Sequence, residues 1–197
     1  LEVLEKALGD GVIDTHSQFG DDTAVIDPKR WKEAAVCLRD DKKLRMDHFI
    51  DLTAVDHLGR RTPRYDVVLH VRSMERLHRV RLKAQIHAEG EDNPRIDGLV
   101  EVWRGANWFE RECYDMFGID FVGHPDLRRI LMYEEFEGHP LRKDYPVQKT
   151  QPLVPYREAD NVKLPPFGDY EGMPFGRQTH AQPIIGEKKV NELGFED

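Results

Sequence analysis

A strict two-residue alternation of apolar and polar side chains is the feature that most limits how this chain can fold. In the segment Leu77–Ala88, Val80, Leu82, Ala84 and Ile86 would share one face, and basic and polar residues the other. Because successive side chains of a strand point to opposite faces, this period predicts a strand with one buried face. The other face would meet water or a partner.

Other segments complete the predicted fold. Two β-rich runs before this strand, Phe49–Asp56 and Tyr65–Arg72, predict further strands. The four residues Ser73–Arg76 can close a hairpin between Tyr65–Arg72 and Leu77–Ala88. The segment Pro28–Arg39 has its apolar residues at helical spacing, and Leu1, Leu4 and Leu8 share that spacing. Short β-like pieces are predicted at Val12–His16 and Thr23–Ile26. These elements predict the α+β class, with helices packed on a mostly antiparallel sheet.

A second helical region is predicted from about Asp97. An apolar stripe begins it, and Asn107, three residues before Glu110, resembles the start of a capping box. Residues Phe109, Cys113, Met116 and Phe117 fall on one helical face. Gly118 is placed to end the helix in a left-handed conformation.

The character of the chain changes after Tyr145, because seven of the 12 prolines follow it and the apolar residues lose their period. This composition is typical of an extended arm that is either disordered or laid along another protein, and its scattered apolar residues favour the second. The sequence thus predicts three parts: a sheet domain over 1–95, a helix-and-turn region over 96–146 packed on it, and a partner-wrapping C-terminal arm over 147–197.

The cysteine content bounds the redox chemistry. Cys37 and Cys113 stand far apart, and there are no further cysteines to complete an iron–sulfur or zinc set. No histidine pattern suggests a metal site, and no glycine-rich phosphate loop is present. We expect reduced core cysteines, no metal site, and electron transfer, if any, through cofactors of other proteins.

Charge and hydropathy exclude further classes. The net charge of −8 argues against a general nucleic-acid binder, and the basic stripe Arg79, Arg81 and Lys83 lacks the aromatic residues that stack bases. No apolar run approaches the roughly 18 residues of a membrane span, and the N-terminus lacks the order of a secretory signal. We expect a soluble protein of the cytosolic side.

The block Glu110–Asp115 packs three carboxylates and a guanidinium into two helical turns. Paired carboxylates could perform acid–base chemistry. An ion network that holds the helix against its neighbour, with Arg111 and Asp115 four residues apart, is the favoured interpretation.

The stretch from Gly105 to Pro146 resembles the 30-kilodalton subunit family of respiratory complex I. The family signature corresponds here to Glu110-Arg111-Glu112, Asp115, Met116-Phe117, His124, Arg128 and Ile130-Leu131 with the required gaps. The flanking Gly105–Trp108 and Gly138–Pro146 also resemble the family.

This resemblance implies an accessory subunit of proton-translocating NADH:quinone oxidoreductase. Such a subunit would scaffold the peripheral arm beside the quinone-reducing 49-kilodalton subunit and the other quinone-module subunits. It would lie peripherally on the cytoplasmic face of the bacterial inner membrane and touch the membrane only through the complex. It would hold no cofactor, because FMN and the iron–sulfur clusters belong to partner subunits, and the isolated chain would have no activity.

The resemblance also implies which residues build the fold and the subunit interface. These are Glu110, Arg111, Glu112, Asp115, Met116, Phe117, His124, Arg128, Ile130, Leu131, His139, Arg142, Lys143, Asp144 and Tyr145. Their charges are predicted to form partly buried pairs within the fold and across the interface with the 49-kilodalton subunit, with Arg129 as a further basic partner.

Three alternatives remain open at this point. The chain could serve a related quinone- or F420-linked complex, or it could be a free-standing module that binds an unrelated protein. It could also be a hydrolase or transferase that uses Glu112 or Asp115 together with His124.

Overall fold

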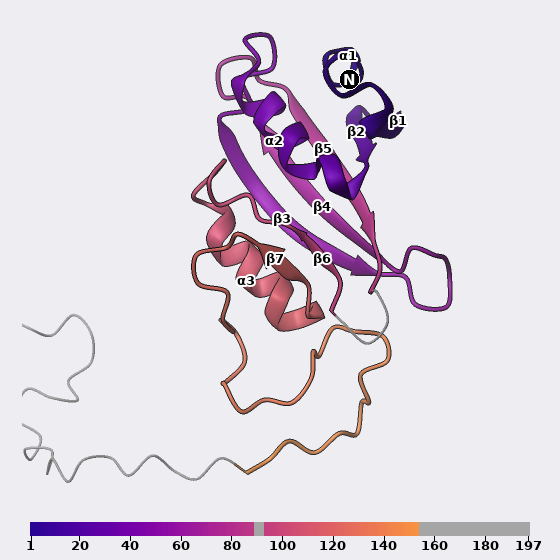
Figure 1. The fold of residues 1–197 in the computed structure, drawn as a ribbon, viewed down its shortest axis with the longest axis vertical. Coiled ribbons are helices and arrows are strands. Elements are labelled where there is room, and N and C mark those ends of the chain that lie inside the picture. Colours follow the sequence, from indigo (N-terminus) through magenta and orange to yellow (C-terminus); the bar gives the residue numbers. More distant parts are fainter. Residues whose placement is uncertain (89–92, 154–197) are drawn as a thin grey trace, which may run out of the picture. The chain divides into compact units, whose positions relative to one another are not determined.

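A computed structural model describes residues 1–88 and 93–153 (Figure 1). The described residues belong to one compact unit. The predicted arm lies almost entirely outside the described residues, and the predicted boundaries at 95 and 146 stay predictions. In the described part of the chain, no helix is long and apolar enough to cross a membrane.

A five-stranded sheet forms the centre of the fold, in the order β1-β2-β5-β4-β3. The strands are β1 (Val12–Gln18), β2 (Asp21–Ile26), β3 (His48–Asp56), β4 (Tyr65–Arg72) and β5 (Arg79–Ile86). Every neighbouring pair is antiparallel except β2 and β5, which run parallel. The α+β class and the mostly antiparallel sheet are therefore confirmed.

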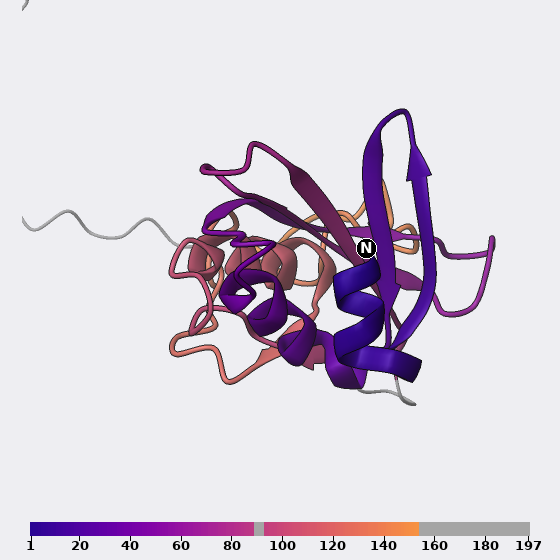
Figure 2. The same cartoon turned by 90° about the horizontal axis from the view of Figure 1, so that it is seen from above.

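The alternation that predicted β5 determines which face of the sheet is buried. Val80, Leu82, Ala84 and Ile86 all belong to the core, as do the alternate residues of β4 that lie opposite them. Helices α1 (Glu2–Leu8) and α2 (Trp31–Asp40) cover this face of the sheet (Figure 2). A 3₁₀ turn, Pro28–Arg30, precedes α2, so the predicted helix begins as a tighter turn.

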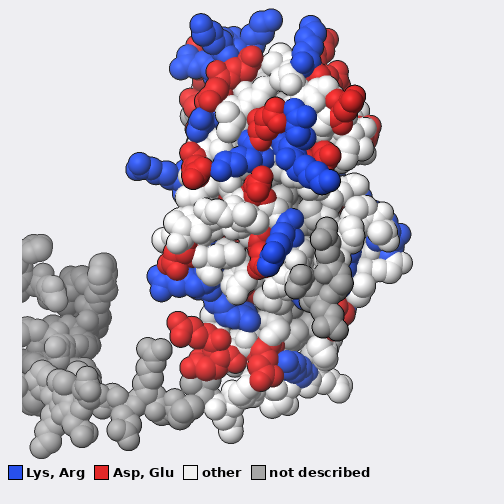
Figure 3. Space-filling model, in the orientation of Figure 1, with Lys and Arg blue, Asp and Glu red and all other residues white. Residues whose placement is uncertain are grey.

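The opposite face of the sheet is mostly polar, and several of its charges are paired. Arg79 and Arg81 lie 2.5 and 3.5 Å from the carboxylate of Asp21, and Arg81 donates to His70 Nε2 at 2.8 Å. The basic stripe is thus neutralised at two of its three positions. On the face of the molecule drawn in Figure 3, basic and acidic side chains are likewise intermixed over most of the surface.

The region after Asp97 differs from the prediction of a helix. Residues Arg95–Asp97 form a short strand, β6, which pairs in parallel with β7 (Asp120–Val122). Turns follow it, in which the amides of Val102 and Trp103 donate to the carbonyl of Leu99. The apolar spacing that suggested a helix therefore belongs to a strand and a turn that face the same core.

Helix α3 (Ala106–Phe117) carries the family signature and packs beside β3 (Figure 1). It begins at Ala106 after Gly105, so the predicted capping box at Asn107 is wrong. The predicted apolar seam is confirmed: Cys113, Met116 and Phe117 are buried and Phe109 packs against the core. Gly118 ends the helix in the left-handed conformation, as predicted, with φ of 70°.

A side chain at Gly118 is expected to destabilise the fold more than one at Gly59. It and Gly59 both have a positive φ, but a Cβ at Gly118 would collide with Arg142 and His139, whereas one at Gly59 meets nothing within 4 Å. Gly59→Ala should lower the free energy of unfolding by about 1 kcal/mol through backbone strain alone. Gly118→Ala should cost about 1–3 kcal/mol more through overpacking. Urea unfolding of both variants measures the difference, and equal losses would contradict the packing argument.

Candidate functional site: the signature helix and the segments it holds

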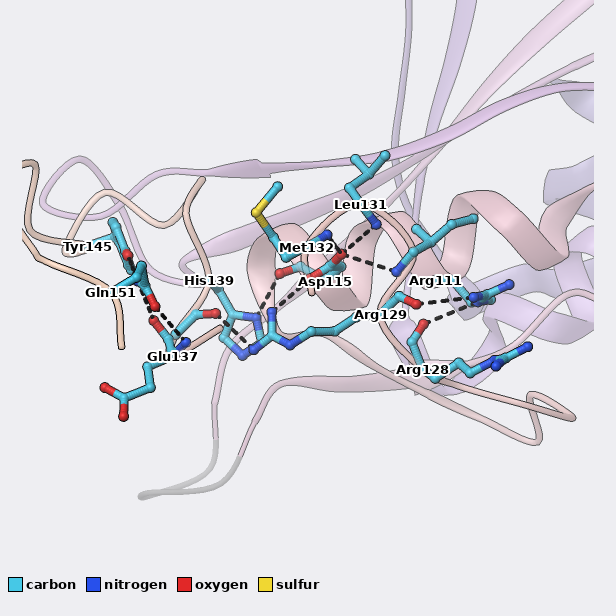
Figure 4. A network of polar contacts seen from close by, with 12 residues as sticks. Arg111, Asp115, Arg128, Arg129, Leu131, Met132, Glu137, His139, Tyr145 and Gln151 are labelled. Atoms are coloured by element: carbon cyan, nitrogen blue, oxygen red, sulfur yellow. Dashed lines mark hydrogen bonds and ion pairs between the residues drawn. The ribbon is translucent and has the colours of Figure 1, made fainter. Parts of the chain in front are cut away.

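The charged residues of the signature extend from α3 to segments that have little regular structure of their own (Figure 4). Residues 123–153 contain no helix or strand. The polar backbone groups of such a segment need partners from elsewhere in the fold when they are buried. Helix α3 supplies many of them.

Asp115 makes the densest set of contacts. Its side chain is fully buried, and Oδ2 accepts from the amides of Ile130, Leu131 and Met132 at 3.1, 2.8 and 2.8 Å. Oδ1 accepts from Arg129 at 2.7 Å. Burial by itself raises the pKa of Asp115, but the three amides and the guanidinium together lower it below its ordinary value.

Arg111 holds the residues immediately before that set of amides. Its Nε and a terminal nitrogen donate to the carbonyls of Arg128 and Arg129, both at 3.1 Å. The predicted pair between Arg111 and Asp115 does not form within the described chain, because each residue binds the 128–132 segment instead. Arg111 and Asp115, one helical turn apart, therefore bind the same segment: the guanidinium binds its carbonyls and the carboxylate binds its amides.

The C-terminal end of α3 is capped by the second motif of the resemblance, Gly138–Pro146. His139 Nδ1 lies 2.9 Å from the carbonyl of Asp115, and the amide of Leu141 donates to Met116 at 3.1 Å. Arg142 donates to the carbonyls of Phe117 and Gly118. A cation at this position also complements the negative end of the helix dipole.

Glu110 points the other way, into the core. It is completely buried, and its Oε1 accepts from the amide of Leu99, in the turn after β6. Its Oε2 has no hydrogen-bond partner among the described residues. A Cβ at Gly98 would come within 3.0 Å of Oε2, so this glycine permits the close approach.

Burial raises the pKa of Glu110 to about 7, against smaller lowering effects of the Leu99 amide and of Lys32. The carboxyl group is therefore largely protonated below neutral pH. It contributes one hydrogen bond to the turn after β6 at the cost of an unpaired buried oxygen.

The remaining predicted residues are spread over the same region, and most do not pair with signature acids. His124 Nε2 contacts the Asn107 carbonyl at 3.1 Å, and Arg128 forms a surface pair with Asp126 at 2.9 Å. The amide of Lys143 donates to Asp56, and the Asp144 carboxylate accepts from Arg64 at 2.8 Å. Of the basic residues predicted to pair with the signature acids, Arg129 alone does so within the described chain. Pairs across the interface with the 49-kilodalton subunit stay a prediction.

Several residues that hold the site were missed from the sequence. Asp56, the last residue of β3, and Arg64, just before β4, bind the 143–144 segment. The two side chains are themselves paired at 2.6 Å. Phe136, also missed, stacks on the predicted Tyr145 with ring centroids 6.1 Å apart. No local pattern marks Arg64 and Asp56, since their partners Asp144 and Lys143 lie 80 and 87 positions away.

The arrangement does not assemble an acid–base pair from the residues suggested for one. Both ring nitrogens of His124 are engaged by backbone groups, the second by the amide of Asp126. Asp115 is saturated, and Glu112 is exposed. Among the residues described, no group of three or more His, Cys, Asp or Glu side chains could hold a metal ion.

The sheet and the packed helix α3 define an α+β domain, and comparisons with known proteins give its family. Residues 24–151 match the family model described as respiratory-chain NADH dehydrogenase, 30 Kd subunit. The chain is 46% identical over 164 residues to the C subunit of NADH-quinone oxidoreductase from Roseiflexus castenholzii, covering 83% of this chain and 92% of the relative. It is 41% identical to the corresponding protein of Thiobacillus denitrificans, covering 73% and 74%.

Solved structures agree. A trypsin-resistant fragment of Nqo5, residues 1–134, superposes with a TM-score of 0.53 at 30% identity, covering 64% of this chain and 97% of the fragment. A chain of the archaeal membrane-bound sulfane sulfur reductase superposes with a TM-score of 0.63 at 17% identity, covering 75% and 83%, which shows a shared fold. This chain belongs to the family of the 30-kilodalton subunit of complex I, which is the C subunit of NADH-quinone oxidoreductase in bacteria.

Replacing Asp115 by Asn should lower the free energy of unfolding by about 2–4 kcal/mol, because the charge that binds Arg129 and three amides is lost. The folded-state pKa of Asp115 lies below 3.8, so its stabilising charge is present above that pH and lost as pH falls through the folded pKa. Urea unfolding at pH 7 and pH 3 should show a gap between variant and wild type that shrinks in acid. Asp126→Asn, which removes only an exposed pair, is the control; a similar loss there would contradict the assignment.

Replacing Glu110 by Gln tests the buried carboxyl. Its pKa is about 7 in the folded chain and 4.5 ordinarily, so the folded state binds the extra proton between these values. The stability of the wild type should therefore fall as pH rises from about 4.5 to 7, by about 3 kcal/mol from this group. The Gln variant should lack that part of the fall in urea unfolding from pH 5 to 8. An unchanged slope would show that Glu110 is already charged in the fold.

Proposed function

We propose that this chain is a cofactor-free accessory subunit that scaffolds the peripheral arm of NADH:quinone oxidoreductase beside the quinone-reducing 49-kilodalton subunit. The observation that carries the proposal is the use of the signature charges. Arg111 and Asp115 bind backbone groups of residues 128–132, and Glu110 binds the turn after β6. The side chains of Arg111 and Asp115 are engaged by these backbone groups, so they order the 128–132 segment on the surface of the fold.

The state of the cysteines supports a chain without redox groups of its own. Cys113 is buried in α3, donates to the Leu52 carbonyl at 3.7 Å, and burial raises the pKa of its thiol far above the ordinary value. Cys37 is half-buried, and burial raises its thiol pKa as well. Metal and cluster ligation requires the thiolate, which both environments disfavour. FMN and the clusters would therefore sit in partner subunits.

The proposed neighbours and location follow from the family. The relatives are named as subunits of NADH-quinone oxidoreductase, so we expect this chain to assemble with the other subunits of such a complex. The 49-kilodalton subunit and the other quinone-module subunits are the proposed direct partners, at the cytoplasmic face of the bacterial inner membrane. The chain would reach the membrane only through the complex.

The test is purification of the tagged full-length chain from gently solubilised host membranes. The expected product is a large assembly that oxidises NADH and shows iron–sulfur absorbance. A colourless free chain, recovered from membranes that contain intact complex I, would overturn the proposal and favour a free-standing binding module.

Arg111→Ala should reduce assembly without changing the chemistry of the complexes that form. Loss of two charge-assisted hydrogen bonds should destabilise the 128–132 segment by about 1.5–3 kcal/mol, and the amount of chain in the complex should fall several-fold. Arg60→Ala is a matched control, since it removes an exposed arginine outside the signature whose side chain makes no hydrogen bond or ion pair with the described residues.

The two measurements are the fraction of tagged chain in the assembly and quinone reduction per assembled complex. A variant that assembles normally but loses quinone reduction would contradict the scaffold role and support a direct part in catalysis.

A further inference from the structure

Two residues in the stretch Gly105–Pro146, which resembles the family, do not help to hold the fold together, although their neighbours do. Trp108 is 69% exposed on α3, and Glu112, one helical turn further on, is also exposed. Glu112 makes no side-chain hydrogen bond or ion pair with the described residues, unlike Glu110, Arg111 and Asp115. The helix therefore has a binding face turned inward and a free face turned outward.

The exposure of Trp108 is unusual for this chain. The other two tryptophans, Trp31 and Trp103, are 0% and 6% exposed. The opposite side of α3 already packs on the core through Cys113, Met116 and Phe117, so the indole of Trp108 gains no burial within the described chain. Large aromatic side chains, tryptophan above all, are enriched among the residues that anchor protein–protein interfaces.

The surroundings of Trp108 give the partner's chemistry. A shallow hollow beside it is lined by Val100, Arg104, Gly105, Asn107 and Phe109. Arg104 is exposed and has no ion pair with the described residues, so Trp108 has an unpaired cation on one side and the Glu112 anion on the other. A complementary surface would present an acid, an apolar pocket and a base in that order.

We propose that this outer face of α3, formed by Arg104, Trp108 and Glu112, is a docking surface for a neighbouring subunit of the same complex, whose apolar pocket receives the indole. The inference rests on the proposed function. It assigns to α3 a second role: the inward charges order residues 128–132, and the outward row binds the neighbour. Another subunit is the occupant because the relatives of this chain are named as subunits of a multi-subunit enzyme.

The direct test places a photo-reactive phenylalanine analogue at position 108 of the full-length tagged chain in its host. After irradiation of the assembled complex, we expect one cross-linked product with another subunit of that complex, identified by mass spectrometry. A control with the analogue at Phe19 is matched, because Phe19 is 96% exposed on the turn between β1 and β2. Cross-links to a second copy of the chain, to its own residues beyond 153, or to no protein would overturn the proposal.

Substitutions test the energetics of the same contact. Trp108→Ala and Glu112→Lys should each reduce incorporation of the chain into the complex by about tenfold or more, as expected when an interface anchor is removed or a charge is reversed. Phe19→Ala and Glu134→Lys, which change exposed residues of the same kinds, should leave incorporation unchanged. The total amount of each variant in the cell, compared with wild type, reports whether the chain still folds.

The outcomes separate this inference from the proposed function. If the wild-type chain never enters an NADH-oxidising assembly, the proposed function itself fails. If the wild type enters it and both α3 variants do so equally well, the docking surface alone is wrong. A charge reversal at the cross-linked basic residue of the partner should restore incorporation of Glu112→Lys, a rescue that a merely unfolded variant would not show.

Discussion

The carboxylate of Asp115 is the contact on which the C-terminal half of this fold depends. One buried anion accepts from three consecutive amides and a guanidinium, and Arg111 takes the two carbonyls just before them. The segment 123–153 has no helix or strand to pair its own backbone. Its polar groups are satisfied by a helix instead, so the conformation of the segment follows from the position of α3.

The same helix links that segment to the sheet. Its apolar seam packs beside β3, its C-terminal carbonyls receive His139, Leu141 and Arg142, and Glu110 reaches back to the turn after β6. Glu110 costs stability, because a buried carboxyl with one unpaired oxygen is less favourable than an apolar side chain. Its bond to the amide of Leu99 defines how the turn before α3 lies against the helix.

The proposed scaffold role needs an ordered surface more than a reactive one, and the contacts of α3 agree with that requirement. The side chains of Arg111 and Asp115 are engaged by the 128–132 segment, whereas Trp108 and Glu112 are exposed to solvent. Such a division fits a protein that presents a preformed surface to its neighbours, since preorganisation lowers the entropy lost on association. The polar sheet face, with Asp21 between Arg79 and Arg81, is by contrast largely neutralised from within.

The sequence by itself determined the strands β3, β4 and β5, their buried faces, the apolar seam of α3 and its end at Gly118, because these depend on short periods and single-residue conformations. The family followed from the spacing of the signature. Only the tertiary structure decided what the signature charges do. Asp115 binds residues 14 to 17 positions away, and Glu110 binds Leu99, 11 positions before it, so the capping box and the Arg111–Asp115 pair expected from local spacing were wrong. Partners in irregular segments have no period, and their identity is settled by which backbone groups the packed core leaves unpaired.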